Sequence, residues 1–385
     1  MSQLPNSLHP LDVASLIHPQ SNLRRHLDTG PTIFDRGEGI YVYDENGNQY
    51  LEAAAGLWCA SLGFGVERLA KVAYEQMCKV GYYHIYRNAS NESAIELAGK
   101  LLEIAPVPMS KVLFQCSGSE ANDTAVKVVW YYWHAHDKPE RRKIIGRKMG
   151  YHGSTCAASS ISGKPDMHQE SGLPFEGFLH TEFPNYYRNQ RPGESEEQFS
   201  ERMAQALEDL IVAEGPETVA AFWAEPVMGA GGAVLPPKGY FEKIQAVLRK
   251  YDILFVADEV ICGFGRTGNM WGSETYALAP DMISCAKGLS AGLQPISALL
   301  MNERVFQALM TESDKVGHFA HGFTYAGHPV TTAVALETLK IYQEMDIVGH
   351  VRAVSEPFVA NLTALEPHPL VGEFRGVGLI GALEI

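Results

Sequence analysis

The sequence predicts an α/β protein built around a parallel β-sheet. Two short apolar runs, residues 253–257 and 282–286, contain no charged side chain. Continuous apolar runs of this length are typical of strands that are buried on both faces, as in a parallel sheet. Asp258 follows the first run, and Lys287 follows the second. Because ligands bind at the carboxyl ends of the strands in such sheets, we expect one acid and one amine at the same edge.

This pair of side chains has a specific chemical use. A lysine that is partly shielded from water has its charged form disfavoured and can form a Schiff base with an aldehyde. A carboxylate can keep a pyridine nitrogen protonated, and pyridoxal phosphate needs both partners. An ordinary salt bridge at the sheet edge would explain the same two residues, so the rest of the chain must decide between the two interpretations.

Composition narrows the classes of function. The chain has 385 residues, of which 46% are hydrophobic and 20% charged, as is usual for a globular enzyme. The net charge of −14 argues against nucleic acid or an anionic membrane as a partner. No apolar run is long enough to span a bilayer, and residues 1–5 lack the pattern of a signal peptide. We therefore expect a cytoplasmic protein.

The cysteines and histidines show no metal or disulfide pattern. None of the 6 cysteines forms a C-x-x-C pair, which favours the reduced thiols of a cytosolic protein. The pairs His134/His136 and His318/His321 lack the flanking residues of a zinc-binding helix. We therefore expect no metal site.

Residues 1–106 begin with an arm and continue into a hairpin and two helices. Prolines interrupt residues 1–35, so we expect an irregular arm there. Asn46-Gly47 predicts a hairpin over 40–51, and Trp58 follows it in an apolar loop, where it could serve the core or a pocket wall. Helices are expected from Val66 and from the Asn91 cap.

A strand, a turn of small residues and a helix form the first candidate ligand site. We expect the strand at 112–115, the turn at 116–123 and the helix at 124–134. Free N–H groups at the helix start, together with the hydroxyls of Ser117 and Ser119, would suit a phosphate. A plain capped turn has the same pattern, so both interpretations stay open.

A second candidate follows the strand expected at 143–145. Tyr151 lies between glycines in Gly150-Tyr-His-Gly153, where its ring could lie flat on a planar ligand. A turn with a surface tyrosine is the alternative. We expect residues 163–200 to form loops over the site rather than sheet, because they are rich in proline, glycine and polar residues.

The second half of the chain continues the alternation of strands and helices. A strand at 219–224 ends at Glu225, a third carboxylate at a strand end. The last segment, 372–385, is expected to form strand, turn and strand, and to stop there as though the chain were cut. A further strand is expected at 296–301, with helices over 196–212, 240–251, from 303, 329–345 and 347–364.

Residues 263–268 match the G-x-G-x-x-G pattern of dinucleotide-binding enzymes. Two acids separate the pattern from its strand, and the residues that follow it do not open a convincing helix. We therefore interpret these glycines as a loop that passes close to the site.

Together the motifs resemble those of the class III, or omega, aminotransferases of PLP fold type I, and in particular the pyruvate-linked amine transaminases. The resemblance implies a mostly parallel, seven-stranded sheet flanked by helices. It also implies a large PLP-binding domain over 61–328 and a smaller α+β domain, here incomplete, built from 1–60 and 329–385. The matching pieces are S-G-S-E-A-N-D (117–123), G-Y-H-G (150–153), A-E-P (224–226), F-V-A-D-E-V-I-C-G-F-G-R-T-G (255–268), A-K-G (286–288) and G-F-T-Y-A-G-H-P (322–329).

The resemblance also implies a role for each matching residue. Lys287 would be the catalytic amine that holds pyridoxal phosphate, and Asp258 would pair with its ring nitrogen. Thr324 would reach the phosphate in the neighbouring subunit, so a homodimer with shared sites is implied, possibly a dimer of dimers. The other implied cofactor contacts are Gly118 and Ser119 (phosphate), Tyr151 and Val260 (ring faces), His152, and Glu225 (support of Asp258 and of the ring hydroxyl side). The implied substrate-pocket residues are Trp58, Tyr86, Tyr151 and Ala230.

The implied reaction transfers the amino group of a primary amine or an omega-amino acid to a keto acid, with pyruvate as the expected acceptor, through alternating PLP and PMP forms. Two alternatives stay open. Decarboxylases and aminomutases use the same scaffold, and a truncated chain could be an inactive PLP-binding dimer protein. The second alternative arises because relatives carry a carboxylate-binding arginine ahead of a Pro-Pro, in a segment beyond Ile385. Arg375 matches a different position.

Overall fold

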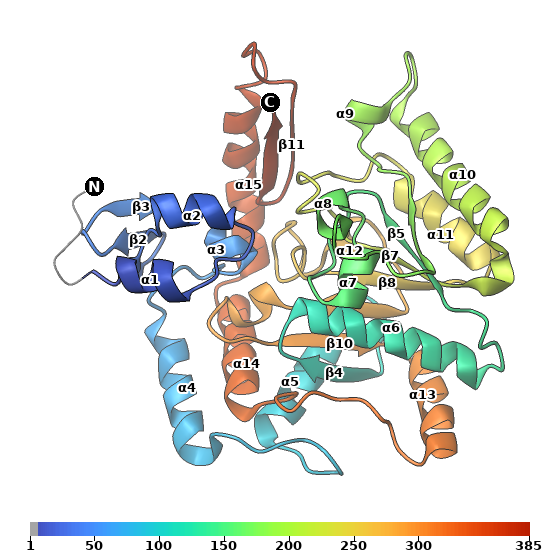
Figure 1. The fold of residues 1–385 in the computed structure, drawn as a ribbon, viewed down its shortest axis with the longest axis horizontal. Coiled ribbons are helices and arrows are strands. Elements are labelled where there is room, and N and C mark those ends of the chain that lie inside the picture. Colours follow the sequence, from blue (N-terminus) through green and yellow to red (C-terminus); the bar gives the residue numbers. More distant parts are fainter. Residues whose placement is uncertain (1–6) are drawn as a thin grey trace.

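The computed structural model describes residues 7–385 (Figure 1). The expectation about a signal peptide concerns residues outside this range. A seven-stranded sheet forms the centre of the molecule, with the strand order β4-β10-β9-β8-β7-β5-β6. Only β10 runs antiparallel to its neighbours, so the expected mostly parallel sheet is confirmed. Its strands are β4 (Lys111–Gln115), β5 (Lys143–Arg147), β6 (Phe178–Thr181), β7 (Val219–Ala224), β8 (Leu254–Asp258), β9 (Met282–Cys285) and β10 (Ser297–Met301).

Helices cover both faces of this sheet, which explains why its central strands are continuous apolar runs. Every residue of β7, β8, β9 and β10 is buried. Successive side chains of a strand point to opposite faces. Trp223 and Val256 accordingly pack with α6 and α13, whereas Phe222 and Phe255 pack with α10 and α11. On that second face, α5 and α14 cover the part of the sheet formed by β4, β9 and β10.

The covering helices are α4 (Glu67–Val80), α5 (Glu92–Glu103), α6 (Gly118–Ala135), α7 (Cys156–Ile161), α8 (Pro165–His168), α9 (Tyr186–Asn189), α10 (Glu196–Glu214), α11 (Tyr240–Lys250), α12 (Gly272–Thr275), α13 (Glu303–Val316), α14 (Pro329–Glu344) and α15 (Ile347–Thr363). The helices expected from Val66, from Asn91, over 196–212 and 240–251, from 303, and over 329–345 and 347–364 are confirmed with small differences at their ends, whereas the short helices α7, α8, α9 and α12 were not expected. Within the described residues, no helix combines the length and apolarity that a bilayer crossing requires.

Two expectations about this part of the chain are wrong. Residues 178–181 are not a loop but β6, an edge strand that pairs in parallel with β5. Its four residues include His180 and Thr181, so the apolar signal is short. Helix α6 begins at Gly118 rather than at Thr124, because the Ser117 hydroxyl caps it by accepting the N–H of Glu120 at 3.2 Å. The expected turn of small residues is therefore the first turn of the helix.

The two ends of the described chain form smaller elements. The N-terminal segment contains α1 (His9–Ser15), α2 (Leu23–Thr29), an antiparallel sheet of β1 (Phe34–Glu38), β2 (Tyr41–Asp44) and β3 (Gln49–Leu51), and α3 (Ala55–Trp58). The expected hairpin is thus confirmed, while the arm contains two short helices instead of being irregular throughout. At the other end, β11 (Glu373–Val377) and β12 (Ile380–Glu384) form the expected strand, turn and strand.

Candidate active site

Two neighbouring strands bring the acid and the amine to the same edge of the sheet. Strand β8 ends at Asp258, whose Cα pairs with that of Ser284 in β9. The N–H of Glu259 donates to the Ser284 carbonyl at 2.8 Å, which fixes this register. Lys287 follows β9 at the start of a single 3₁₀ turn, Lys287–Ser290.

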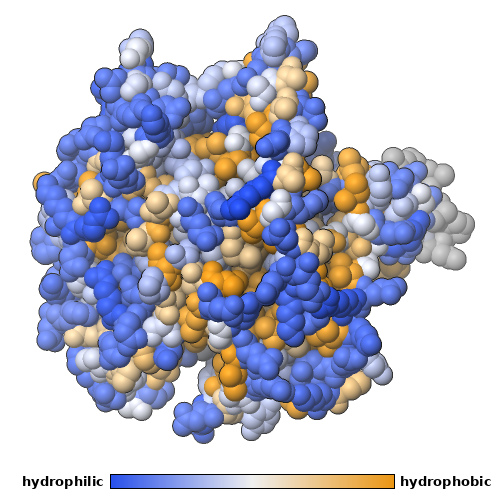
Figure 2. Space-filling view, turned by 180° about the vertical axis from the view of Figure 1, so that it is seen from behind, coloured by the Kyte–Doolittle hydropathy of each residue, from blue (hydrophilic) through white to orange (hydrophobic). Residues whose placement is uncertain are grey.

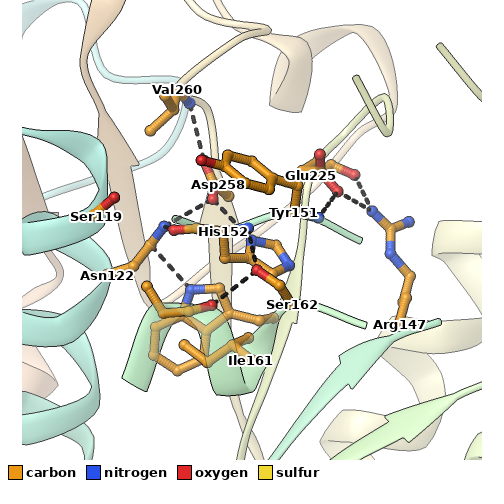
Figure 3. Close-up of polar contacts among 12 residues, drawn as sticks. Ser119, Asn122, Arg147, Tyr151, His152, Ile161, Ser162, Glu225, Asp258 and Val260 are labelled. Carbon is orange, nitrogen blue, oxygen red and sulfur yellow. Dashed lines mark hydrogen bonds and ion pairs between the residues drawn. The ribbon is translucent and has the colours of Figure 1, made fainter. Parts of the chain in front are cut away.

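Three donors converge on the Asp258 carboxylate (Figure 3). Its Oδ2 accepts from Nδ1 of His152 and from Nδ2 of Asn122, each at 2.8 Å, and its Oδ1 accepts from the N–H of Val260 at 3.1 Å. Asp258 is only 3% exposed, and Asn122 is fully buried. Because a carboxylate oxygen accepts hydrogen bonds, Nδ1 of His152 is the donor in this contact. Nε2 of His152 is buried and has no hydrogen-bond partner among the described residues.

Asn122 is a site residue to which the sequence analysis gave no role, although it lies within the quoted motif 117–123. It projects from α6, and its Nδ2 also donates to the His152 carbonyl at 2.7 Å. Its Oδ1 accepts from Nε1 of Trp223 at 3.1 Å. One amide thus connects α6, the turn that carries His152, and strands β7 and β8. An amide on the fully buried face of a helix is the signal that could have revealed this role, because such a group needs partners.

Glu225 lies at the end of β7, between Arg147 and Tyr151. Its Oε2 is 3.7 Å from Nη2 of Arg147 and accepts the Tyr151 N–H at 3.5 Å (Figure 3). Burial raises the pKa of Glu225, against the opposing charges of His152 and Arg147. Its Oε1 has no hydrogen-bond partner within the described chain. No hydrogen bond joins the carboxyl groups of Glu225 and Asp258, and the nearby charge of Asp258 also raises the pKa of Glu225.

Lys287 combines an unusual backbone with a partly buried amine. Its φ of 49° lies in the left-handed region, which costs free energy for a residue with a side chain. Burial lowers the pKa of Lys287, while the nearby Cys59, Asp258 and Glu225 act in the opposite direction. The net lowering increases the fraction of neutral amine, which is the nucleophilic form.

The start of α6 lies directly against the turn 150–154. The Ser119 Oγ accepts the N–H of Ser154 at 3.0 Å. A Cβ on Gly153 would lie 2.5 Å from that Oγ, and a Cβ on Gly118 would lie 2.9 Å from Cγ2 of Val260, so neither glycine has room for a side chain. The first N–H groups of a helix have no partner within it, and they favour an anion.

The remaining candidate residues, Trp58, Tyr86, Ala230 and Thr324, lie outside the Asp258 network. Arg266 donates from Nη2 to the Trp58 carbonyl at 3.0 Å, and its guanidinium lies 5.6 Å from the Trp58 ring. Tyr86 packs on Gly322, and the Tyr82 hydroxyl donates to the Thr324 carbonyl at 2.9 Å. Thr324 and Ala230 are exposed, and Tyr86 is 41% exposed. Among the described residues, no hydrogen bond joins these side chains to the Asp258 network.

The groups at the sheet edge fit pyridoxal phosphate. That cofactor carries an aldehyde, a ring nitrogen and a phosphate. The site offers an amine with a lowered pKa, a carboxylate that three donors hold in place, and a helix start with free N–H groups. The unpartnered Nε2 of His152 and Oε1 of Glu225 are buried polar atoms that a bound group could satisfy.

Comparison with known proteins points in the same direction. Residues 24–385 match the family model described as aminotransferase class-III. The chain is 51% identical over 358 residues to gamma aminobutyrate transaminase 3, chloroplastic, of Solanum lycopersicum, which covers 93% of this chain and 69% of that protein. It is 51% identical over 353 residues to vanillin aminotransferase of Capsicum chinense, which covers 91% of this chain and 77% of that protein.

The fold is also similar to that of solved transaminases. The omega transaminase from Pseudomonas jessenii in complex with PMP superposes with a TM-score of 0.98 at 52% identity, covering 98% of this chain and 84% of that chain. A structure described as transaminase with L-ala superposes with a TM-score of 0.90 at 54% identity, covering 91% of this chain and 83% of that chain.

Proposed function

The chain belongs to the class III aminotransferases, which use pyridoxal phosphate, and we propose that it moves the amino group of a primary amine or omega-amino acid to a keto acid, with pyruvate as the acceptor. The observation that carries this proposal is the Asp258 carboxylate, held by His152, Asn122 and Val260, at the same sheet edge as Lys287. The choice of an amine donor is supported by the solved relatives, which are omega transaminases.

The proposal assigns a place to each group of the cofactor. Lys287 would bind the aldehyde, Asp258 would pair with the ring nitrogen, and the start of α6 at Gly118 and Ser119 would hold the phosphate. Tyr151 and Val260 would contact the ring, with His152 and Glu225 in support. When bound, the cofactor supplies an electron sink for the bond that is broken at the substrate carbon.

The side chains of this protein then divide the work. Once the substrate amine has taken its place at the aldehyde, the freed amine of Lys287 would accept the proton from the carbon that carries the amino group, as its lowered pKa allows. Asp258 keeps the ring nitrogen protonated, and His152 and Asn122 hold the carboxylate in position for this. After the amine donor has left as a carbonyl compound, the same groups act in reverse on the keto acid. The two half-reactions alternate, as in a ping-pong scheme.

We propose a homodimer in which each subunit completes the site of the other. In the single chain, the segment with Tyr86 and the loop with Thr324 lie apart from the Asp258 network and expose apolar side chains. Figure 2 shows apolar areas reaching the surface on the face opposite to that of Figure 1. A second copy that covered this region would bury them. Exposed apolar residues near Tyr86 and Thr324 along the chain include Met77, Val80, Tyr82, Tyr83 and Tyr325.

The domain division follows the same logic. All members of the Asp258 network fall within 61–328, so we propose that this range is the cofactor-binding unit and that 1–60 and 329–385 form the smaller one. Figure 1 places the N-terminal strands and α15 on the same side of the central sheet. The cytoplasm is the proposed location, supported by cysteines that are all free in the described chain.

Product analysis with Lys287→Ala tests the function. With pyridoxal phosphate, an amine and pyruvate, the wild type should form alanine and the matching carbonyl compound in equal amounts, and the variant should form neither. Lys238→Ala is the control, because that side chain is 75% exposed and forms an ion pair with Glu197 on the surface. Release of carbon dioxide would indicate a decarboxylase, an isomeric amine would indicate an aminomutase, and cofactor binding without any product would indicate an inactive PLP-binding protein.

A further inference from the structure

Three side chains of the N-terminal arm meet at one point. Asp12 lies on α1, His18 in the connection that follows, and His26 on α2. Nε2 of His18 is 3.0 Å from each carboxylate oxygen of Asp12, and Nε2 of His26 is 3.1 Å from Oδ1. The two imidazole rings stack with centroids 4.1 Å apart. One potential ligand atom from each residue lies within 4.8 Å of the other two.

We propose that Asp12, His18 and His26 form a binding site for a divalent cation of the Zn²⁺ type. Zinc bonds to histidine nitrogen and to carboxylate oxygen at about 2.0–2.2 Å, so ligand atoms around a tetrahedral ion lie roughly 3.3 Å apart. The nitrogen–oxygen distances of 3.0 and 3.1 Å are within a few tenths of an ångström of that separation. Each histidine presents Nε2 to the same point, so a small outward shift would admit the ion.

The donor set selects the chemical class of the ion. Two imidazoles with one carboxylate suit zinc and its neighbours in the first transition series. Calcium and magnesium prefer oxygen ligands alone, so they are disfavoured. Three protein ligands leave a fourth position of a tetrahedron for water. The side chains are sheltered but reachable, with exposed fractions of 15% for Asp12, 30% for His18 and 11% for His26.

The helices of the surrounding arm are short and exposed. Helices α1 and α2 have seven residues each, and neither contains a buried residue. Helices this short are not stable alone in water. Leu11, Leu16, Ile17, Leu23 and Leu27 are all more than half exposed. An ion that joined Asp12 to His26 would close a loop of 14 residues (26 minus 12) and order the arm, since metal binding to preformed ligands adds to folding free energy.

No metal site was expected from the sequence, because His134/His136 and His318/His321 lack the flanking residues of a zinc-binding helix. The three residues of this cluster do not follow a regular spacing. They lie 6 and 8 positions apart (18 minus 12, and 26 minus 18), and Pro19 lies between them. Only the reversal of the chain between α1 and α2 brings the histidines to the carboxylate. The alternative is that the three side chains form hydrogen bonds to one another and bind no ion. The following experiment distinguishes the two.

Zinc uptake by the holoenzyme provides the test. The protein is freed of metal with a chelator and titrated with Zn²⁺ in competition with a chromogenic chelator. His18→Gln, His26→Gln and Asp12→Asn should each lower the affinity of one wild-type site by at least tenfold. His368→Gln and Asp28→Asn are matched controls, since both residues are exposed and outside the cluster, and they should titrate like the wild type. Equal zinc uptake by wild type, ligand variants and controls would overturn the proposal.

Hydrogen exchange distinguishes an ion that orders the arm from adventitious binding to surface histidines or thiols. Zn²⁺ should slow amide exchange in peptides that cover residues 9–29 of the wild type, and it should leave the same peptides of His18→Gln unchanged. An equal response of both proteins would contradict the assignment. Because the cluster has no contact with the Asp258 network, transaminase activity should persist in all these variants, so this result and that of the Lys287→Ala test are independent.

Discussion

The two sides of the candidate active site are built in opposite ways. On the Asp258 side, every polar group comes from the central sheet or from elements packed on it, and Asp258, His152 and Asn122 are at most 3% exposed. On the side of Tyr86 and Thr324, both residues are exposed, and their segments contact each other through the Tyr82 hydroxyl and Gly322. The first side can be complete within one chain. In the proposed dimer, the second side would gain its surroundings from the other subunit.

This difference teaches that the two sides should respond differently to substitution. A buried network with matched donors is costly to disturb, because any group that loses its partner stays desolvated. An exposed side chain can hydrogen-bond to water, so its removal changes the free energy of unfolding little. We expect such a substitution to affect mainly substrate preference. Four substitutions examine this contrast, in decreasing order of expected effect.

Asp258→Asn should reduce kcat by roughly 100-fold or more, a size typical of the loss of one preorganised electrostatic group. The amide keeps the shape of the side chain but removes its negative charge, so the ring nitrogen is no longer held protonated. Turnover with an amine and pyruvate measures the effect. Asp314→Asn, on the exposed surface of α13, is the control, and comparable activity in Asp258→Asn and the control would contradict the proposed role.

Asn122→Ala should destabilise the protein by about 1–3 kcal/mol, because it leaves the Nε1 of Trp223 buried without an acceptor and removes a donor from Asp258. Activity should fall as well, since the carboxylate is less firmly held. Urea denaturation measures the first effect, and the pH profile of kcat reports the second. If stability falls while the pH profile stays that of the wild type, Asn122 supports the fold but does not position Asp258.

His321 should make the Thr324 loop sensitive to acid. Its Nε2 contacts the Thr124 hydroxyl at 2.9 Å, and Nζ of Lys127 donates to its Nδ1 at 3.2 Å. Burial, and then the charge of Lys127, lower the pKa of His321 from 6.5 to about 4. Between these values the unfolded chain binds more protons than the folded one, so the contribution of His321 is complete above pH 6.5 and decreases as the pH falls towards 4.

The measurement is hydrogen exchange of peptides that cover residues 318–327, at pH values on both sides of this range. After correction for intrinsic exchange, opening should increase on acidification in the wild type, and His321→Gln should remove most of this dependence. His134→Gln, an exposed position on α6, should behave like the wild type. The same acid response in all three proteins would rule out His321 as its source.

Tyr86→Phe should have the smallest effect. Tyr86 is 41% exposed, and its hydroxyl lies over Gly322 and makes no hydrogen bond within the described chain. The free energy of unfolding should therefore change by no more than about 0.5 kcal/mol. The ratio of kcat/KM between a bulky and a small amine should shift by a few fold at most. A loss of activity as large as that of Asp258→Asn would mean that this side of the site is as tightly built as the other.

The sequence could predict the site residues that come directly after a buried strand. Strands β7, β8 and β9 are buried on both faces, so each appears as an uncharged run, and Glu225, Asp258 and Lys287 stand out after them. Strand β6 escaped prediction because four residues that include His180 and Thr181 resemble a loop. The start of α6 was misplaced because serine and glycine are weak helix formers, although both are suited to its first turn.

Contacts between distant segments could not be predicted in this way. Asn122 lies 136 positions from Asp258, and nothing in the local pattern of α6 indicates that its amide faces that carboxylate. The pairing of Arg147 with Glu225 and the meeting of Asp12, His18 and His26 are likewise products of the folded chain. Motif resemblance supplied the roles of Lys287, Thr324 and Tyr86, which single-sequence physical reasoning leaves open.

The single amide of Asn122 has a consequence for how the protein is made. It bonds to groups at positions 152, 223 and 258, which leave the ribosome well after it does. Until β8 has been synthesised, this helix carries an amide without all of its final partners, and the apolar face around it lacks β8, β9 and β10 of the sheet that it covers. The central sheet is therefore incomplete while about the first 250 residues are synthesised. During this time we expect chaperones to bind the nascent chain.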